Sequence, residues 1–486
     1  MNWADLGTIA PVVWAVLVAA AVLVVDLALP GRRAPAIAVA LAGLAIVALV
    51  ILSLAGHTER AFGGAYTLDS LTTFLDMLFL AIGAMTILFA NDYLEPRGLP
   101  IAEFAAILIF AVTGAMLIAG SADLLLLFVA LELMVLPGYL LVGFSRRDPN
   151  STEGAIKYFL LGSFSSAILL FGLAYVWGTT GSTRVDVIAV ALTRLVATGS
   201  IQPGLAMGLA FMTTGVAFKM AAVPFHYWTP DAYQGSPTPV TAYLSVGPKI
   251  GAFAIVLRLF VEALGPLKAD WLPVVIILAA LTMTLGNLVA ITQDNVKRML
   301  AYSSIAHTGY ILVGLAAYAG GQHSGITAIL FYGVAYTFMN MGAFAVIAAL
   351  QHWPGVTSQI STFAGLGRRD PWLGLLMAIF LLSLTGIPPL AGFWAKFYVI
   401  LAAVQGGGWL TVLAVLAMLN AAAAAFYYLR VVVYMYMREP AEGIEATRPS
   451  LLFRVGLAAT GIVTVFIGLI PVFQTLASNA ADVLKV

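Results

Sequence analysis

The chain has 486 residues, of which 62% are hydrophobic and 9% are charged, with a net charge of +1 and no cysteine. An average soluble domain has about 25% charged residues, so this composition has too few charges to cover the surface of a soluble protein. The lack of cysteine excludes disulfides and cysteine-held iron–sulfur clusters or haems, and the near-zero net charge argues against nucleic-acid binding.

Long apolar runs follow one another along the chain. A helix needs about 20 apolar residues to cross the hydrocarbon core of a bilayer, and these runs lack the short alternation of barrel strands. We therefore predict an all-α, polytopic membrane protein with about 14 transmembrane helices joined by short loops. The predicted spans are 9–29, 34–55, 69–90, 101–120, 122–144, 154–178, 205–229, 237–264, 271–292, 300–319, 324–350, 372–403, 409–437 and 451–476.

Basic residues collect in or beside the loops that follow odd-numbered spans. The positive-inside rule places such loops in the cytoplasm, so both termini are predicted on the non-cytoplasmic side. The first span is too long for the apolar region of a signal peptide and is expected to stay in the protein. The basic residues of the odd-numbered loops include Arg32, Arg33, Arg146, Arg147, Lys297, Arg298, Arg368 and Arg369.

One short sequence similarity links two spans that cross the membrane in opposite directions. "PGYLLVGF" (137–144) in the fifth span resembles "TGYILVGL" (308–315) in the tenth. Repeats that lie five crossings apart have inverted topology, an arrangement that transporters use to build a site near the middle of the bilayer. Eight residues alone leave open whether the repeat is real.

Five ionisable side chains lie well inside predicted spans, where a charge costs about 2.5–3.5 kcal/mol on insertion scales. They are Glu132, Lys219, Lys249, His307 and Lys396. One explanation is structural, in which Glu132 and one lysine form an ion pair that fastens helices together. That pair leaves two lysines without an evident carboxylate. Because removal from water disfavours the ammonium form, such lysines can exchange protons near neutral pH.

Other ionisable residues are less central. Lys157, near the start of the sixth span, either joins these buried residues as a further proton relay or extends its ammonium to the membrane surface. Asp69, Asp76, Arg258 and Glu262 lie nearer to span ends, and we interpret them as anchors at the membrane interface.

Prolines interrupt two of the spans that carry a lysine. Pro224 follows Lys219 in "GVAFKMAAVPFHYWTP", and Pro388 and Pro389 precede Lys396 in "LTGIPPLAGFWAKF". A proline within a helix removes a backbone hydrogen bond and costs about 3 kcal/mol or more. The twelfth span would also be about 48 Å long as a continuous helix, which exceeds the bilayer core. We predict two broken, hydrated helices, with an ordinary proline kink as the alternative.

The two histidines inside spans allow several roles. A b-type haem usually uses paired histidines on facing helices, more than His226 and His307 offer. A hydrogen-bonded histidine in a polar pocket is one explanation for His226, and a further relay is the other. Ser303, Ser304 and Thr308 surround His307, so we favour a proton relay there.

Four stretches together resemble the antiporter-like, proton-translocating membrane subunits of respiratory complex I, the NADH:quinone oxidoreductase. They are "FAVTGAMLIAGSADLLLLFVALELMVLPGYLLVGF", "KMAAVPFHYWTPDAYQGSPTPVTAYLSVGPKIGAF", "NVKRMLAYSSIAHTGYILVGL" and "LSLTGIPPLAGFWAKFYV". "NSTEGAIKYFLLGSFSSAILLFG" and "YGVAYTFMNMGAFAVI" favour the bacterial subunit N branch over subunits L and M. The resemblance covers roughly residues 65–435.

The resemblance implies a fold of fourteen helices with two inverted five-helix repeats. The expected parts are an N-terminal three-helix segment (1–100), a first repeat (101–264), a second repeat (265–437) and a C-terminal helix (438–486). By the same resemblance, the proton-translocating residues of the family fall on Glu132, Lys219, Lys249, His307 and Lys396.

The resemblance also implies which cofactors and substrates other subunits would bind. NADH, FMN, iron–sulfur clusters and quinone would be bound by other subunits, so this chain would hold no cofactor or metal. Its partners would be subunit M, small membrane subunits, the lipid bilayer and protons, in the bacterial inner membrane.

Two other functions stay open. The first is a subunit of a multisubunit cation/proton antiporter, which shares the fold and the glutamate and lysine pattern; the two subunit N-like stretches argue against it. The second is a membrane scaffold that does not pump and whose buried charges only fasten helices. A change at Lys396 separates this scaffold from a pump, because it would impair assembly in a scaffold and turnover in a pump.

Overall fold

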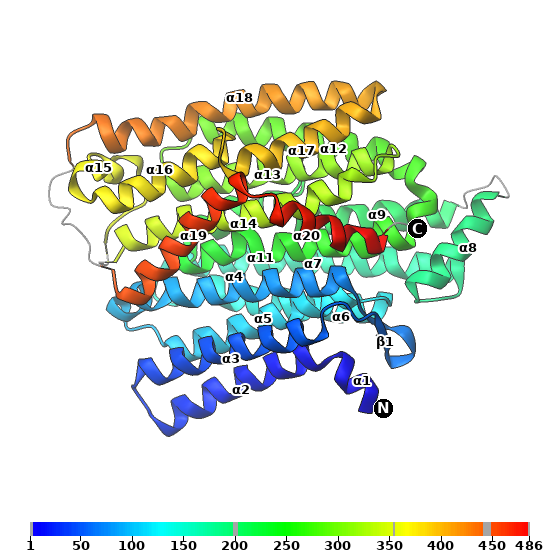
Figure 1. Cartoon of the computed structure of the whole chain (residues 1–486), viewed down its shortest axis with the longest axis horizontal. Coiled ribbons are helices and arrows are strands. Elements are labelled where there is room, and N and C mark those ends of the chain that lie inside the picture. Colours follow the sequence, from blue (N-terminus) through cyan, green and yellow to red (C-terminus); the bar gives the residue numbers. More distant parts are fainter. Residues whose placement is uncertain (1–2, 198–202, 353–354, 441–448, 485–486) are drawn as a thin grey trace.

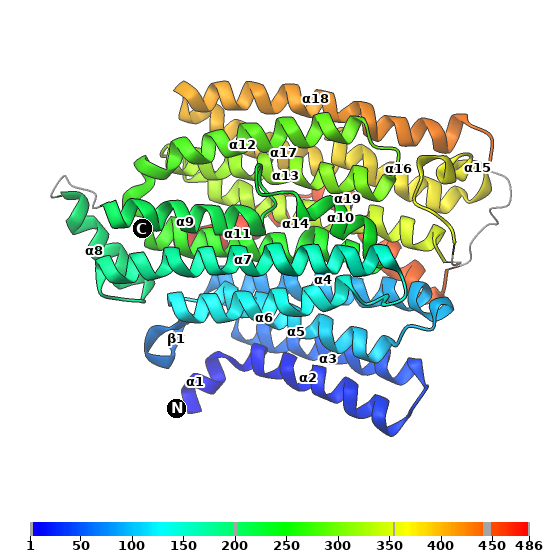
Figure 2. The same ribbon diagram turned by 180° about the vertical axis from the view of Figure 1, so that it is seen from behind.

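The computed structural model describes residues 3–197, 203–352, 355–440 and 449–484. Long helices run side by side along the longest axis of the molecule, and the N- and C-termini lie at the same end (Figure 1, Figure 2). Within the described residues, one small antiparallel sheet pairs β1 (Glu59–Ala61) with β2 (Tyr66–Leu68) at that end. The all-α membrane fold predicted from the apolar runs is confirmed.

The N-terminal segment and the helices up to residue 263 form the first half of the structure. Their bounds are α1 (Trp3–Thr8), α2 (Ala10–Ala28), α3 (Arg33–Leu54), η1 (Phe62–Gly64), α4 (Ser70–Leu94), η2 (Glu95–Arg97), α5 (Ile101–Gly120), α6 (Leu124–Val142), α7 (Pro149–Thr180), α8 (Val185–Ala197), α9 (Pro203–Lys219), α10 (Trp228–Gly235), α11 (Thr238–Val256) and the π-helical turn η3 (Leu257–Ala263).

The second half begins with a short 3₁₀ turn and ends at the C-terminus. Its bounds are η4 (Gly265–Leu267), α12 (Lys268–Ile291), α13 (Val296–Ala319), α14 (Ser324–Leu350), η5 (Ile360–Phe363), α15 (Leu366–Arg369), α16 (Pro371–Thr385), α17 (Ala391–Gly406), α18 (Gly408–Met437), α19 (Leu451–Leu469), α20 (Val472–Ala481) and η6 (Asp482–Leu484).

Twelve of the described helices are long and apolar enough to cross a membrane. The predicted seventh and twelfth spans are instead each divided into two shorter helices, α9 with α10 and α16 with α17. The two broken helices are therefore present as predicted. The total of fourteen crossings stays a prediction, because it counts each divided pair as one crossing.

Local capping explains where several helices begin. A side-chain oxygen before the first turn accepts a backbone N–H that has no partner within the helix. The residues that cap in this way are Asp69, Asp123, Asp148, Asn295, Asp370 and Ser450.

Several short elements outside the predicted spans were not predicted. They include the β1–β2 hairpin and α8, which lie towards the end that carries the termini (Figure 1). Arg184 connects them, since it donates to the Gly63 carbonyl and to both oxygens of Asp186. The Arg184 guanidinium holds the pKa of the Asp186 carboxyl below its usual range.

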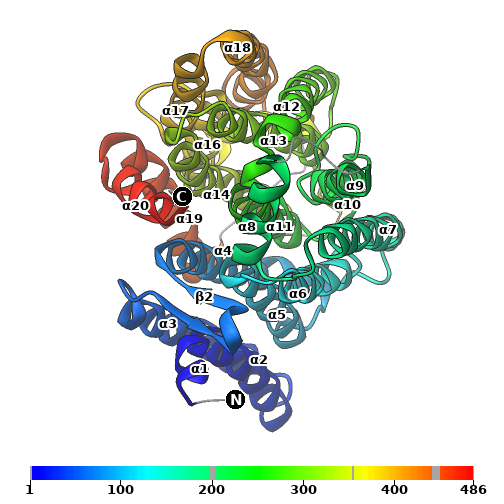
Figure 3. The same cartoon turned by 90° about the vertical axis from the view of Figure 1, so that its right-hand side faces the viewer.

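The centre of the bundle is formed by α11, α13 and α14, which are almost wholly buried, whereas α2, α3 and α18 expose much of their surface. Viewed along the helices, α11 and α14 lie inside a ring of the other helices (Figure 3). Two of the predicted site residues lie on these central helices, Lys249 on α11 and His307 on α13.

Candidate functional site

The first break lies between α9 and α10, and Lys219 is the last residue of α9. Polar side chains from other segments bind the backbone groups that the break releases, as broken membrane helices require. Thr282 accepts the Val223 N–H at 3.0 Å, and Thr308 donates to the Met220 carbonyl at 2.8 Å. Pro224 lies inside this break, as its position in the sequence predicted.

The second break follows α16 and contains Pro388 and Pro389. Gly386 adopts a φ of 96° there, a left-handed conformation that favours glycine. The Nζ of Lys396 reaches back from α17 and donates to the carbonyls of Leu384 and Thr385, both at 2.9 Å. The lysine thus binds the open carboxyl end of α16.

A close backbone approach holds the two halves of this second break together. A Cβ atom added to Gly392 would lie 1.8 Å from the Ser383 carbonyl oxygen. We expect Gly392→Ala to destabilise the protein by about 1–3 kcal/mol, the usual cost of overpacking. Thermal unfolding of the purified protein measures this. Gly178→Ala is the control, because nothing lies within 4 Å of its added Cβ; equal stability of the two variants would contradict the expectation.

Lys219 is buried, and its ammonium binds neutral groups. Its Nζ donates to the Ser166 hydroxyl at 2.9 Å and to the Gly162 carbonyl at 3.3 Å. Glu132 is half-buried, and its Oε1 has no hydrogen-bond partner among the described residues. Among the described residues, no ion pair joins the two side chains, although the charge of Glu132 acts on Lys219 through space.

Lys249 lies in the centre of the bundle and is 3% exposed. Its Nζ donates to the Ser304 carbonyl at 2.6 Å and to the Thr308 hydroxyl at 3.2 Å. Thr308 is the same side chain that binds the Met220 carbonyl in the first break. One hydroxyl therefore connects Lys249 to the residue next to Lys219.

His307 lies between hydroxyl groups on two other helices. Its Nδ1 is 2.7 Å from the Tyr332 hydroxyl and its Nε2 is 3.2 Å from the Tyr428 hydroxyl. Tyr428 also contacts the Ser303 hydroxyl. Further on, the Nζ of Lys396 lies 5.0 Å from the ring centre of Tyr310. Polar side chains thus follow one another from Lys219 through Lys249 and His307 towards Lys396 in the second break. We call this row of residues the lysine line.

The tyrosines in this line were missed at the sequence level. Tyr332, Tyr336 and Tyr428 are buried, and Tyr336 donates to the Ser304 hydroxyl at 2.7 Å. Tyr310 and Asn287 form a further hydrogen bond at 3.2 Å. A signal was available, because buried tyrosine hydroxyls usually need a partner.

The two residues predicted as further relays lie outside this line. Lys157 forms ion pairs with Glu153 at 2.6 Å and with Asp231 of α10 at 2.7 Å, and Arg298 also binds Asp231 at 2.8 Å. His226 lies in the first break, buried, with an Nδ1 that has no partner among the described residues. The structure does not bring it to His307.

Lys297 departs from the sequence interpretation. We counted it among the basic residues of a loop, but it lies in the first turn of α13 and is 3% exposed. Its Nζ donates to the Ser236 carbonyl at the end of α10, at 2.6 Å. A lysine at this position is attracted by the free carbonyls of a helix end, which explains its burial.

Comparisons with known proteins show the class of protein to which this chain belongs. The family model described as "NADH:quinone oxidoreductase/Mrp antiporter, TM" matches residues 121–420. In a structural comparison, a chain of respiratory complex I from Thermus thermophilus aligns with a TM-score of 0.78 at 33% identity, over 95% of this chain and 97% of that one. A chain of the Mrp complex from a Dietzia species shares the fold, with a TM-score of 0.82 at 22% identity over 100% and 98% of the two chains. These matches define an antiporter-like membrane subunit.

Closer relatives narrow the class to one branch. The chain is 42% identical over 472 residues to NADH-quinone oxidoreductase subunit N of Trichlorobacter lovleyi, and 43% identical to the subunit N of Chloroflexus aggregans. Both alignments cover 96% of this chain and 95% of the relative. The chain belongs to the NADH-quinone oxidoreductase subunit N family.

Proposed function

We propose that this protein is the proton-translocating membrane subunit N of an NADH:quinone oxidoreductase, coupled to electron transfer in other subunits. One observation carries the proposal. In the described residues, Lys219, Lys249 and Lys396 are buried without an ion-pair partner. Lys219 and Lys249 each donate to one hydroxyl and one carbonyl, and Lys396 donates to two carbonyls. A buried lysine of this kind can accept and release a proton at modest cost, whereas a lysine fixed to a carboxylate cannot.

Proton transfer along this line follows from the hydrogen bonds. Lys249 reaches the Thr308 hydroxyl, and His307 reaches the hydroxyls of Tyr332 and Tyr428. Hydroxyl and imidazole groups both accept and donate protons, so each is suited to pass a proton between lysines, with water where gaps remain. Glu132, which acts on Lys219 through space, supplies a charge that can bias the first step.

The chain carries no redox chemistry in this proposal. NADH, FMN, iron–sulfur clusters and quinone are assigned to other subunits, since the lysine line consists of groups that can carry protons. Co-purification tests the assignment: the tagged chain should bring down a complex that contains flavin and iron–sulfur clusters and oxidises NADH. A complex that exchanges sodium for protons without NADH oxidation would favour the Mrp-type alternative.

The internal organisation supports the proposal of two inverted repeats, 101–264 and 265–437. In each repeat the broken helix is the fourth in membrane order: α9 and α10 in the first, α16 and α17 in the second. The similar stretches 137–144 and 308–315 likewise fall in the second helix of each repeat, α6 and α13. Residues 1–100 and 438–486 flank the repeats.

The proposed orientation places both termini on the non-cytoplasmic side of the bacterial inner membrane. The helix α15, which contains Arg368 and Arg369, lies at the end of the molecule opposite the termini (Figure 1), and basic residues favour the cytoplasm. A reporter that is active only outside the cytoplasm should be active when fused to the C-terminus. The same reporter inserted after Arg147 should be inactive. The reverse pattern would contradict this orientation.

A further inference from the structure

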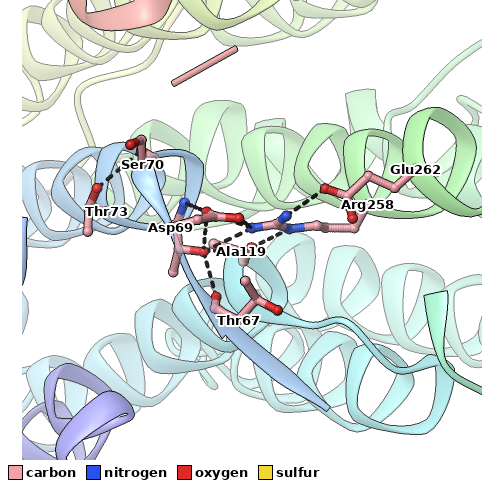
Figure 4. A network of polar contacts seen from close by, with 8 residues as sticks. Thr67, Asp69, Ser70, Thr73, Ala119, Arg258 and Glu262 are labelled. Carbon is pink, nitrogen blue, oxygen red and sulfur yellow. Dashed lines mark hydrogen bonds and ion pairs between the residues drawn. The ribbon is translucent and has the colours of Figure 1, made fainter. Parts of the chain in front are cut away.

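A second group of buried charges lies apart from the lysine line, at the end of the molecule that carries the termini. Figure 4 shows Arg258, from the turn η3, reaching between Asp69 and Glu262. Its guanidinium donates to both oxygens of Asp69 at 2.9 and 2.8 Å, to Glu262 at 2.7 Å and to the Ala119 carbonyl at 2.8 Å. We predicted that Arg258 and Asp69 are anchors at the membrane interface, but both are buried. Their opposite charges form an ion pair, which makes this burial possible. We call Asp69, Arg258 and Glu262 the Arg258 cluster.

The Arg258 cluster has unequal charges. Two carboxylates share one guanidinium, which leaves a net charge of −1 when both are ionised. The Glu262 side chain is 18% exposed, whereas those of Arg258 and Asp69 are 3% and 1% exposed. Glu262 is thus the most exposed side chain of the cluster.

Asp76 extends this cluster into the protein. It follows Thr72 by four residues on α4, so both lie on one face of the helix, and Thr72 accepts a hydrogen bond from Arg258 at 2.9 Å. Asp76 is fully buried, and neither of its carboxylate oxygens has a partner among the described residues. The buried hydroxyl of Tyr66 also lacks a partner there. The prediction of an interfacial anchor was therefore wrong for Asp76, because the packing of α4 encloses it.

Asp76 lies deeper along α4 than the Arg258 cluster. Seven residues of helix separate it from Asp69, or about 10 Å. Leu75 and Leu78, on the same stretch of α4 as Asp76, line a small apolar cavity together with Ile250 and Phe253 of α11. This stretch of α4 therefore lies beside the α11 segment that follows Lys249.

A buried carboxylate without a hydrogen-bond donor is costly in its ionised form. The charged and titratable groups that act on it are Asp69 on its own helix, Arg258 from η3 and Tyr66 from β2. With Asp76 ionised, the four charged side chains, Asp69, Asp76, Arg258 and Glu262, sum to −2. One proton on Asp76 reduces this to −1, so binding of a proton relieves repulsion as well as desolvation.

We propose that Asp76 is a proton-binding site that connects the lysine line to the outside through the Arg258 cluster. The ligand is a proton: the Asp76 carboxylate takes it up as a carboxylic acid and releases it to water near Glu262, while Arg258 keeps its own protons. The site rests on the proposed function, since it needs a source of protons in the interior. It also joins the N-terminal segment, which contributes Asp69 and Asp76, to the first repeat, which contributes Arg258.

Asp76→Asn tests the site, because asparagine has the same shape and cannot bind the proton. The experiment uses the whole complex in membrane vesicles, with complex content matched on native gels. We expect normal assembly, an about tenfold fall in NADH-driven proton uptake, and loss of a carboxylic-acid infrared band that titrates in the unmodified protein. Asp92→Asn is the matched control on the same helix, where Asp92 accepts the Ser450 N–H at 2.6 Å; it should leave uptake and the band unchanged.

The outcomes separate this inference from the proposed function. Normal uptake and an unchanged band in Asp76→Asn, with uptake lost in Lys396→Arg, would overturn the Asp76 site alone. Normal uptake in both variants would overturn the proposed function as well. If Asp76→Asn fails to assemble, Asp76→Glu decides, since it keeps a carboxyl group. A shifted pH dependence of uptake and of the infrared band in Asp76→Glu would support the site, and unchanged profiles would overturn it.

Discussion

Lys396→Arg is expected to assemble into the complex and to lower NADH-driven proton uptake by about a hundredfold, the contribution typical of a positioned proton-transfer group. Arginine retains a positive charge and enough donors for the Leu384 and Thr385 carbonyls that Lys396 binds. It cannot release its proton in a protein, so it keeps the structure and removes the transfer step. Proton uptake and NADH:quinone activity in membranes with matched complex content measure the effect.

Two further variants make this result specific. Lys268→Arg, at an exposed lysine at the start of α12, should leave both activities unchanged. Lys396→Ala should lose uptake as well, with lower stability, because the two carbonyls lose their donor. Full activity in Lys396→Arg would show that the lysine only fastens the broken helix, and the scaffold explanation would then stand.

Glu132→Gln and Lys219→Ala should each slow NADH-driven proton uptake by about tenfold or more. An ionised Glu132 favours the ammonium form of Lys219, and a coupling of about 1.4 kcal/mol changes proton occupancy about tenfold. Glu132→Gln should not hinder insertion, since it removes a charge from α6. Because the two residues act as one unit, the double variant should be less impaired than the sum of the single effects.

The double-variant comparison uses the same membranes, gels and dye-based proton uptake. Effects that add in full would mean that the two residues act independently, in agreement with the missing ion pair. Full uptake in either single variant would remove Glu132 and Lys219 from the proposed switch.

Much of the fold could be predicted because the bilayer imposes a simple rule on the sequence. The long helices have 19 to 32 residues and are mostly apolar, and the prolines beside Lys219 and Lys396 mark the two breaks. The hairpin at 59–68 and α8 lie outside this rule. They contain no long apolar run, and tertiary contacts such as those of Arg184 hold them in place.

The charged residues of the candidate site could be predicted from the sequence, whereas the contacts between them could not. A lysine inside an apolar span is conspicuous, whereas the buried hydroxyl of Tyr428 is not, since tyrosine is common in membrane helices. The pairing of Asp69 with Arg258 was also beyond the sequence, because the two residues are 189 positions apart. Each alone resembles an interfacial charge, and only packing shows that they neutralise one another.

The partner of Lys396 is the carboxyl end of α16 rather than an acidic side chain. Such a helix end is equivalent to roughly half of a negative charge, and it does not titrate. A full carboxylate would fix the proton on the lysine, and a wholly apolar pocket would expel it. A permanent half-charge stabilises the ammonium less than a full carboxylate does, which suits the proton transfer that we propose for this residue. In the proposed function, the backbone of α16 thus supplies a fixed partial charge that holds the Lys396 ammonium without a second titrating group.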